Sequence, residues 1–323
     1  MRITRRRLLA LMAASSSPLI ATRIATSAPP IKMIVGFRPG GTADTIARAV
    51  AEGLRASGYT CVVENRPGAS GRLAAEALLR APPDGTTLLM TPSPNLTLFP
   101  HIYSDLKVGL GDLSIVGTAA EVQMGLAVSK EVGPATLAQF LEQARNDPSR
   151  GFYGTPGTGS VMQLLGSVLA QRSQAPLSNV PYKGGAESLN DVISGTVPAA
   201  ITALPNLIPM HQAGRLRILA VTSDKRLSAI PDVPTFASLG YPEMTASEYM
   251  CLVARKGSPA EVFDPLMAAF ATAVNARATV AVIEKTGFER ASSVGQSATL
   301  ARLTADSARW KAAVKDSGFR ATE

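Results

Sequence analysis

From Ile31 onward, short runs of β-branched and apolar residues alternate with stretches whose apolar residues recur at helical spacing. This alternation constrains the fold most strongly, because it is typical of a parallel sheet covered by helices. In the first part of the chain the predicted strands are residues 31–37, 59–64 and 86–91. One predicted helix begins near residue 43, and a second spans residues 71–79. We therefore expect a β-α-β-α-β half of a doubly wound domain.

A second series of the same kind follows an apolar connection at residues 122–128. Its predicted strands are residues 151–155, 179–181, 197–202 and 216–222, and its predicted helices are residues 137–145, 160–171, 186–193 and 207–212. One more strand is expected at residues 246–254, and everything after Pro259 is expected to be helical. Without a flexible tether between the two series, the pattern favours two lobes joined by hinge strands, with a binding site in the crevice between them.

The first 28 residues have the composition of an export signal. Five arginines lie there without any Asp or Glu, and an apolar run from Leu8 to Ala14 follows most of them. The segment Thr4-Arg5-Arg6-Arg7-Leu8-Leu9 resembles the twin-arginine export signal, and Thr26-Ser27-Ala28 is a suitable cleavage site. We expect a signal peptide at residues 1–28 and a mature protein in the periplasm.

The formal charge of +8 is concentrated in this segment. The rest of the chain carries 27 basic and 24 acidic residues, and no later stretch is a basic run interleaved with aromatic residues. Nucleic acid is therefore not an expected partner.

The chain has two cysteines, Cys61 and Cys251. After export they would meet an oxidising compartment, where they could form a disulfide. The alternative, which we favour, is a pair of small buried side chains that remain unpaired.

Patterns that indicate catalysis are sparse. His101 and His211 are the only histidines, and neither has a neighbour at metal-ligand spacing. Residues 68–72 miss the pattern of a serine hydrolase, because the fifth position is Arg72 rather than glycine. Residues 36–42 lack the lysine of a phosphate-binding loop, and Met162 stands where a dinucleotide fingerprint requires glycine. We expect no catalytic residue, no metal and no cofactor.

Two glycine-rich loops lie where a predicted strand leads into a predicted helix, at residues 38–44 and 155–160. A helix start carries unpaired N–H groups and a partial positive charge, so it binds anions without a cationic side chain. One such loop in each lobe would give two facing anion sites, sufficient to hold a small carboxylate. The alternative is that the glycines only let each helix pack close to the sheet.

The first loop also contains two ionisable residues. Asp44 falls in the first helical turn, where a carboxylate usually caps the helix; in a site it would instead hold water, a ligand hydroxyl or an ammonium group. Arg38 is the one permanent cation in either loop. It would either pair with a ligand carboxylate or remain solvated at the rim.

A set of short motifs extends in order from about Ile31 to Gly318. The motifs are Phe37-Arg38-Pro39-Gly40-Gly41-Thr42-Ala43-Asp44, Val63-Glu64-Asn65-Arg66-Pro67-Gly68-Ala69, Pro82-Pro83-Asp84-Gly85, Gly157-Thr158-Gly159, Pro181-Tyr182-Lys183-Gly184-Gly185, Arg226 with Pro231-Asp232-Val233-Pro234-Thr235, and Arg309-Trp310. Together they resemble the Bug receptors, the substrate-binding proteins of tripartite tricarboxylate transporters. Each motif alone is weak, but the ordered set is very specific.

The resemblance implies an α/β fold of the periplasmic binding protein type II class, with two doubly wound lobes joined by two crossing strands and the ligand cleft between them. The first lobe would comprise residues 29–124 and 246–323, and the second residues 125–245. The lobes would close over a small organic acid, a mono- or dicarboxylate. One carboxylate would be held by backbone amides of both glycine loops and by ordered waters.

The resemblance also nominates ligand-binding residues by position. They are Phe37, Gly40, Gly41 and Asp44 in the first loop, Gly157, Thr158 and Gly159 in the second, and Ser93 and Tyr182 elsewhere, to which Arg38 is added as a cation beside the site. Tyr182 is equally well explained as a packed core residue.

Four positions depart from the usual pattern of the family: Gly36 replaces a proline, Arg38 a small residue, Gln163 a histidine, and Ala203 an often polar residue. These departures concern the choice of ligand and leave the architecture intact. Arg38 favours a second carboxylate on the ligand.

The favoured function is a monomeric receptor that passes its acid to the membrane subunits of a transporter. One alternative is an exported enzyme that uses Asp44 or Tyr182 as acid or base, and another is a sensor that signals when loaded. The receptor is preferred because no nucleophile-base pair is visible in the sequence.

Overall fold

The computed structural model describes residues 30–104, 106, 108–182, 184–292, 294–317 and 319. The predicted signal peptide and its cleavage site lie outside the described residues. The strands are β1 (Ile31–Val35), β2 (Cys61–Asn65), β3 (Thr87–Pro92), β4 (Leu113–Ser129), β5 (Phe152–Thr155), β6 (Ser178–Pro181), β7 (Ala199–Ala203), β8 (Leu216–Val221), β9 (Ser247–Arg255) and β10 (Glu289–Arg290). The helices are α1 (Thr42–Arg55), α2 (Arg72–Arg80), α3 (Pro94–Thr97), α4 (Phe99–Ile102), α5 (Leu137–Asn146), α6 (Val161–Ser173), α7 (Gly185–Ser194), α8 (Leu204–Gln212), α9 (Ala260–Asn275), α10 (Arg277–Lys285) and α11 (Gln296–Ser317).

The strands pair in the order β2-β1-β3-β9-β4-β7-β5-β6, with β8 and β10 also paired to β4. The first three strands are parallel to one another, as are β5, β6 and β7, whereas β4 and β9 run antiparallel to their neighbours. This order confirms the predicted α/β architecture of two parallel-strand groups connected by crossing strands.

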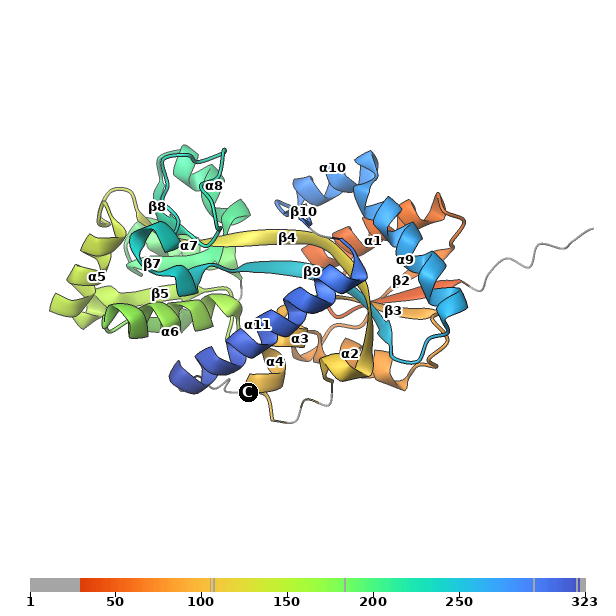
Figure 1. Ribbon diagram of the computed structural model, residues 1–323. Helices are drawn as coiled ribbons and strands as arrows, with labels where there is room; N and C mark the ends of the chain where they lie inside the picture. The colour runs from red at the N-terminus through yellow and green to blue at the C-terminus, as the bar shows by residue number, and fades with distance from the viewer. Residues whose placement is uncertain are drawn as a thin grey trace, which may run out of the picture.

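The two groups are joined by β4 and β9, which run through the middle of the molecule side by side (Figure 1). Residues 113–123 of β4 pair with β9, and residues 124–129 pair with β7 and β8. One strand is therefore shared by both sheets. The strands β4 and β9 thus occupy the place of the hinge strands expected from the sequence.

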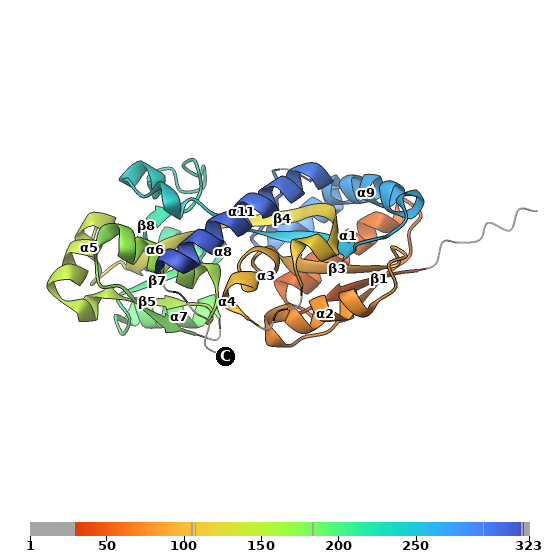
Figure 2. The same ribbon diagram turned by 60° about the horizontal axis from the view of Figure 1, so that its bottom comes forward.

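Helix α11 spans the junction on the outside of the crossing strands (Figure 2). It contacts β4 and α3 near its start and α6 near its end. Its buried Trp310 and Val314 belong to the same apolar cluster as Phe140 and Leu165 of the second group. The last helix therefore packs on both halves of the molecule.

The structure corrects three predictions of local structure. The apolar connection at 122–128 is only the end of β4, whose first half was missed because two irregularities in its pairing disturb the alternation of side chains. Helices α3 and α4 were not predicted, since their prolines suggest turns, although proline is well tolerated in a first helical turn. The expectation that everything after Pro259 is helical is wrong at β10, which pairs with β4.

Both cysteines are free thiols, as expected, but only Cys251 is buried, whereas Cys61 is half-buried. Cys61 lies in β2 and Cys251 in β9, with β1 and β3 between them. Three strand spacings amount to about 14 Å, twice the largest Cα separation that a disulfide bridges. Burial raises the pKa of both thiols, that of Cys61 to about 12.

Within the described part of the chain, no single helix has the length and hydropathy needed to cross a bilayer. Helices α9 and α10 meet these two criteria only as a pair, which is bent by 63° between them. Phe263, Leu266 and Phe270 of α9 are buried in the core of the first group of strands.

Arg302 of α11 connects the helix to both crossing strands. Its guanidinium donates to Glu121 Oε2 on β4 at 2.8 Å and to Ser247 Oγ on β9, and it lies 4.0 Å from the centre of the Tyr249 ring. Glu121 is only 6% exposed, and its other oxygen accepts a hydrogen bond from the backbone N–H of Ser292. The pair therefore satisfies a carboxylate that is buried at the hinge.

Replacing this guanidinium would leave the buried carboxylate of Glu121 without its counter-ion. We expect Arg302→Met to lower the free energy of unfolding by about 3 kcal/mol, measured by urea denaturation. Arg55→Met is the matched control, because the Arg55–Glu52 pair is exposed and contributes at most about 1 kcal/mol. Equal losses in the two variants would contradict the role assigned to Arg302.

Candidate functional site

A cleft of about 630 Å³ lies between the two groups of strands. Both glycine-rich loops line it, as do residues of β9 and β4 on its floor. Its apolar lining includes Phe37, Phe99, Met162, Met250 and Phe288. Among the described lining residues, Arg38 and Glu248 are the two whose side chains carry charge. The predicted position of the binding site, between the lobes, therefore coincides with a cavity of suitable size for a small ligand.

The first glycine loop is held in shape by the carboxylate of Asp44. This side chain is 2% exposed and accepts hydrogen bonds from the backbone N–H of Gly40 (2.9 Å), from Arg48 Nε (2.9 Å) and from Asn65 Nδ2 (2.8 Å). Asn65 also donates to the carbonyl oxygen of Phe37 at 3.1 Å. Gly40 adopts φ +80°, a conformation that favours glycine. The loop conformation thus depends on one buried carboxylate and one glycine.

The electrostatics of Asp44 follow from these contacts. Burial acts to raise the pKa of the carboxyl, but the hydrogen bonds from Arg48, from the Gly40 amide and from Asn65 outweigh it, so the pKa is lowered. The side chain is therefore an anion whose oxygens are occupied by protein donors. It acts as the loop's internal brace, and it does not line the cleft described above.

With the Asp44 carboxylate bound to Gly40, the first backbone N–H groups of α1 remain open, that is, without an acceptor among the described residues. Gly40 donates to Asp44 and Gly41 donates to the Arg38 carbonyl at 3.3 Å, whereas the N–H groups of Thr42 and Ala43 have no acceptor among the described residues. Thr42 and Ala43 both line the cleft. The donors available to a ligand are thus shifted from the glycines to the first two residues of the helix.

The second loop repeats the same device on the other side of the cleft. The backbone N–H of Gly159 donates to Gln163 Oε1 at 2.9 Å, and the N–H of Gln163 donates to Ser160 Oγ at 3.2 Å. As in the first loop, a side chain in the first helical turn binds a glycine amide four residues earlier. The amides of Gly157 and Thr158 have no acceptor among the described residues, and both residues line the cleft.

Other residues nominated from the sequence are engaged within the protein. Ser93 is buried, and its hydroxyl accepts a hydrogen bond from the Tyr249 backbone N–H at 3.2 Å. The hydroxyl of Tyr182 donates to Asp191 Oδ2 at 2.7 Å, and its ring packs against Gly154. Neither is among the described residues that line the cleft. Arg38, by contrast, is exposed and does line it.

Sequence reasoning missed Glu248, which lies in the floor of the cleft. It is the second residue of β9 and is paired with Val122 of β4. The side chain is half-buried, and its partial removal from water raises the pKa of the carboxyl to about 7. Its signal in the sequence was an acidic residue in alternation with Met250 within a predicted strand, which places both side chains on one face of the sheet.

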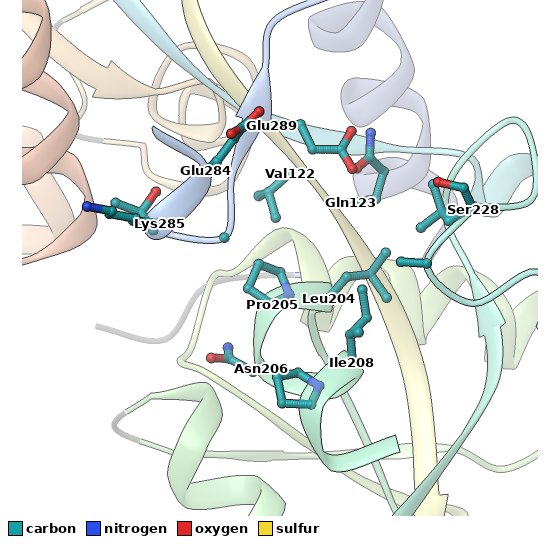
Figure 3. A pocket seen from close by; sticks show the side chains of 15 residues that line it. Val122, Gln123, Leu204, Pro205, Asn206, Ile208, Ser228, Glu284, Lys285 and Glu289 are labelled. Atoms are coloured by element: carbon teal, nitrogen blue, oxygen red, sulfur yellow. The ribbon is translucent and has the colours of Figure 1, made fainter. Parts of the chain in front are cut away.

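A second cavity of about 480 Å³ lies beside the first and shares Val122 and Asn206 with it (Figure 3). It is bordered by α8, by β4 and by the segment from the end of α10 to β10. Here Gly287 packs against Pro205 so closely that an added Cβ would lie 2.2 Å from it. This cavity contains neither glycine loop, so we place the ligand site in the larger cleft.

The described part of the chain was also examined for groups of potential metal ligands. No group of three or more His, Cys, Asp or Glu side chains there is arranged to hold a metal ion.

Comparison with known proteins agrees with this arrangement. A family model described as the tripartite tricarboxylate transporter family receptor matches residues 46–319. Protein BugT of Bordetella pertussis is 34% identical over 239 residues, which cover 72% of this chain and 72% of that protein.

Solved structures extend the similarity to the fold. A structure described as a periplasmic transporter is 29% identical, covers 92% of this chain and 99% of its own, and gives a TM-score of 0.77. The structure of R. palustris Rpa4515 with adipate is also 29% identical, with 90% and 97% coverage and a TM-score of 0.74. The resemblance and the type II fold expected from the motifs are confirmed. The chain belongs to the tripartite tricarboxylate transporter receptor family, whose members are solute-binding receptors.

Proposed function

We propose that this protein is exported to the periplasm, captures a small organic carboxylate in the cleft and delivers it to the membrane subunits of a tripartite tricarboxylate-type transporter. The observation that carries the proposal is the pair of glycine loops, each with open N–H groups and each held by a side chain in the first turn of the helix that follows it. Fixed donors at a helix start stabilise an anion because no reorganisation is needed when it binds. The similarity to a protein solved with adipate supports the choice of a carboxylate.

Capture and release require the cleft to open and close. We propose that the lobes, at 29–124 with 246–323 and at 125–245, rotate about β4 and β9 as a monomer closes on its ligand. A bound carboxylate would bridge the two loops and favour the closed arrangement, since it interacts with both only when they approach. The transporter would then distinguish the closed, loaded receptor from the open one.

An exported enzyme is the competing function, and its proposed acid or base was Asp44 or Tyr182. Asp44 is braced by three donors, and the Tyr182 hydroxyl is bound to Asp191. Neither group is free to exchange a proton with a ligand in the cleft, which favours the receptor. Incubation of the purified protein with candidate acids should therefore give saturable stoichiometric binding without turnover.

A side chain added to either glycine loop should obstruct the carboxylate. An added Cβ at Gly157 meets no atom within 4 Å, and one at Gly41 approaches only the Arg38 carbonyl oxygen at 3.3 Å, so the fold tolerates both changes. We expect Gly41→Val and Gly157→Val to abolish the rise in melting temperature that a bound acid gives the parent protein. Gly111→Val, also in open space but remote from the cleft, should keep the full rise.

The substitution Asp44→Asn tests whether the Asp44 carboxylate positions the first glycine loop for ligand binding. The variant should bind acids about tenfold more weakly, because an amide no longer fits three donors, a loss comparable to one hydrogen bond to a charged group. Its unfolding free energy should be lower at pH 7 by about 1–2 kcal/mol. Since the folded pKa of Asp44 is lowered, this difference is present above the unfolded pKa and disappears as pH falls below about 4.

Urea denaturation at pH 7 and pH 3, with isothermal titration calorimetry at pH 7, measures both effects. Asp264→Asn on the exposed side of α9 is the control and should change neither quantity. Unaltered affinity in Asp44→Asn would contradict the brace.

A further inference from the structure

Glu248 is positioned to meet the ligand. Residues of a strand alternate between its two faces, and Glu248 and Met250 both line the cleft. Tyr249, between them, points to the opposite face, where its hydroxyl donates to Asp306 of α11 at 2.8 Å. The carboxyl of Glu248 is thus presented to the cleft from the floor formed by the crossing strands.

The described part of the chain provides no partner for this carboxyl. Among the residues that the structure describes, no donor lies at hydrogen-bonding distance from the Glu248 carboxyl and no cation pairs with it, whereas Glu121 on the neighbouring strand is engaged. Glu121 on β4 is bound by Arg302 and the Ser292 amide. A carboxyl that reaches a ligand cavity without a protein partner is available to a group on the ligand.

The other charged lining residue, Arg38, is exposed on the wall formed by the first glycine loop. Arg38 and the open helix amides supply positive potential at the loops, while Glu248 supplies a carboxyl at the floor. A second ligand carboxylate at the floor would meet a like charge, whereas an ammonium group would meet an opposite one.

We propose that Glu248 is the specificity-determining residue of the cleft, and that it selects acids bearing an ammonium group over acids bearing a second carboxylate. The inference rests on the proposed function, because the glycine loops must hold the first carboxylate. The sequence led us to expect a dicarboxylate, because of Arg38. The proposed ligand is instead a zwitterion, with one carboxylate and one ammonium group.

The selection depends on pH in a defined direction. Burial raises the pKa of Glu248 to about 7, so the carboxyl is neutral in mildly acidic solution and charged in mildly alkaline solution. The charged groups on the elements around it are Arg38 in the cleft, Glu121 with Arg302 behind β4, and Glu289 on β10. When neutral, Glu248 can donate one hydrogen bond to a second ligand carboxylate; when charged, it repels that carboxylate and attracts ammonium.

The test compares straight-chain dicarboxylates from succinate to adipate with the ω-amino acids of the same lengths, by isothermal titration calorimetry at pH 6 and pH 8. The ammonium groups stay charged across this range, and the dicarboxylates are predominantly dianions at both pH values. For the parent protein, the ratio of ω-amino acid to dicarboxylate affinity should exceed one at pH 8 and fall by about tenfold or more at pH 6, consistent with one linked proton. Glu248→Gln should show a ratio that is lower at pH 8 and unchanged by pH. Glu261→Gln, exposed on α9, should behave as the parent.

The outcomes distinguish the two proposals. If the parent binds acids but Glu248→Gln retains its ratio and pH dependence, or if the parent prefers dicarboxylates at pH 8, the role of Glu248 is overturned and the receptor function stands. If the folded parent binds none of the acids at either pH, the proposed function fails and this inference fails with it.

A measurement without ligand checks the same group and the folding of the variant. An acid whose pKa is raised on folding loses stability as pH increases from its unfolded pKa through its folded pKa. The melting temperature of the parent should therefore contain a decline between about pH 5 and pH 8 that Glu248→Gln lacks. Parallel melting profiles for the two proteins would show that Glu248 does not titrate in this range and would overturn the pH-dependent selection.

Discussion

The site depends on one repeated interaction, a hydrogen bond from a glycine amide to a side chain four residues later in the first turn of a helix. Asp44 binds Gly40 in one half of the molecule, and Gln163 binds Gly159 in the other. Each bond fixes a glycine loop, and the open amides of that loop belong to residues that line the cleft. The proposed anion site is therefore built from backbone groups whose directions are set before a ligand arrives, and the order of the loop costs nothing further on binding.

In the proposed function, the crossing strands connect the two glycine loops to a rotation of the two lobes. Because β4 pairs with β9 along one part and with β7 and β8 along the other, the two halves share a continuous hydrogen-bonded element. Arg302 ties α11 to both crossing strands at the point where Glu121 is buried. The floor of the cleft, where Glu248 lies, belongs to the same strands, so the proposed ligand would meet the crossing strands with its far end.

Much of the fold could be predicted because periodicity and turn residues are local signals, and the parallel strands of both halves follow the predicted runs closely. The long strand β4 could not be predicted in full, because Gly117 and the neighbouring bulges interrupt the alternation of its buried and exposed side chains. Its role also depends on partner strands that are far away in sequence. The glycine loops could be recognised in the sequence. The amides that remain open could not be predicted, because side chains such as Gln163 accept hydrogen bonds from some of the loop amides. Glu248 was overlooked because only the three-dimensional structure shows that its strand forms the cleft floor.

The central claim is that main-chain N–H groups of the two glycine loops hold a carboxylate. The most direct measurement is a crystal structure of the protein with a bound acid, adipate or an ω-amino acid. We predict carboxylate oxygens within about 3 Å of the amide nitrogens of Thr42 or Ala43 on one side and of Gly157 or Thr158 on the other. An acid bound in the cleft or in the neighbouring cavity, with those amides bonded to water alone, would contradict it.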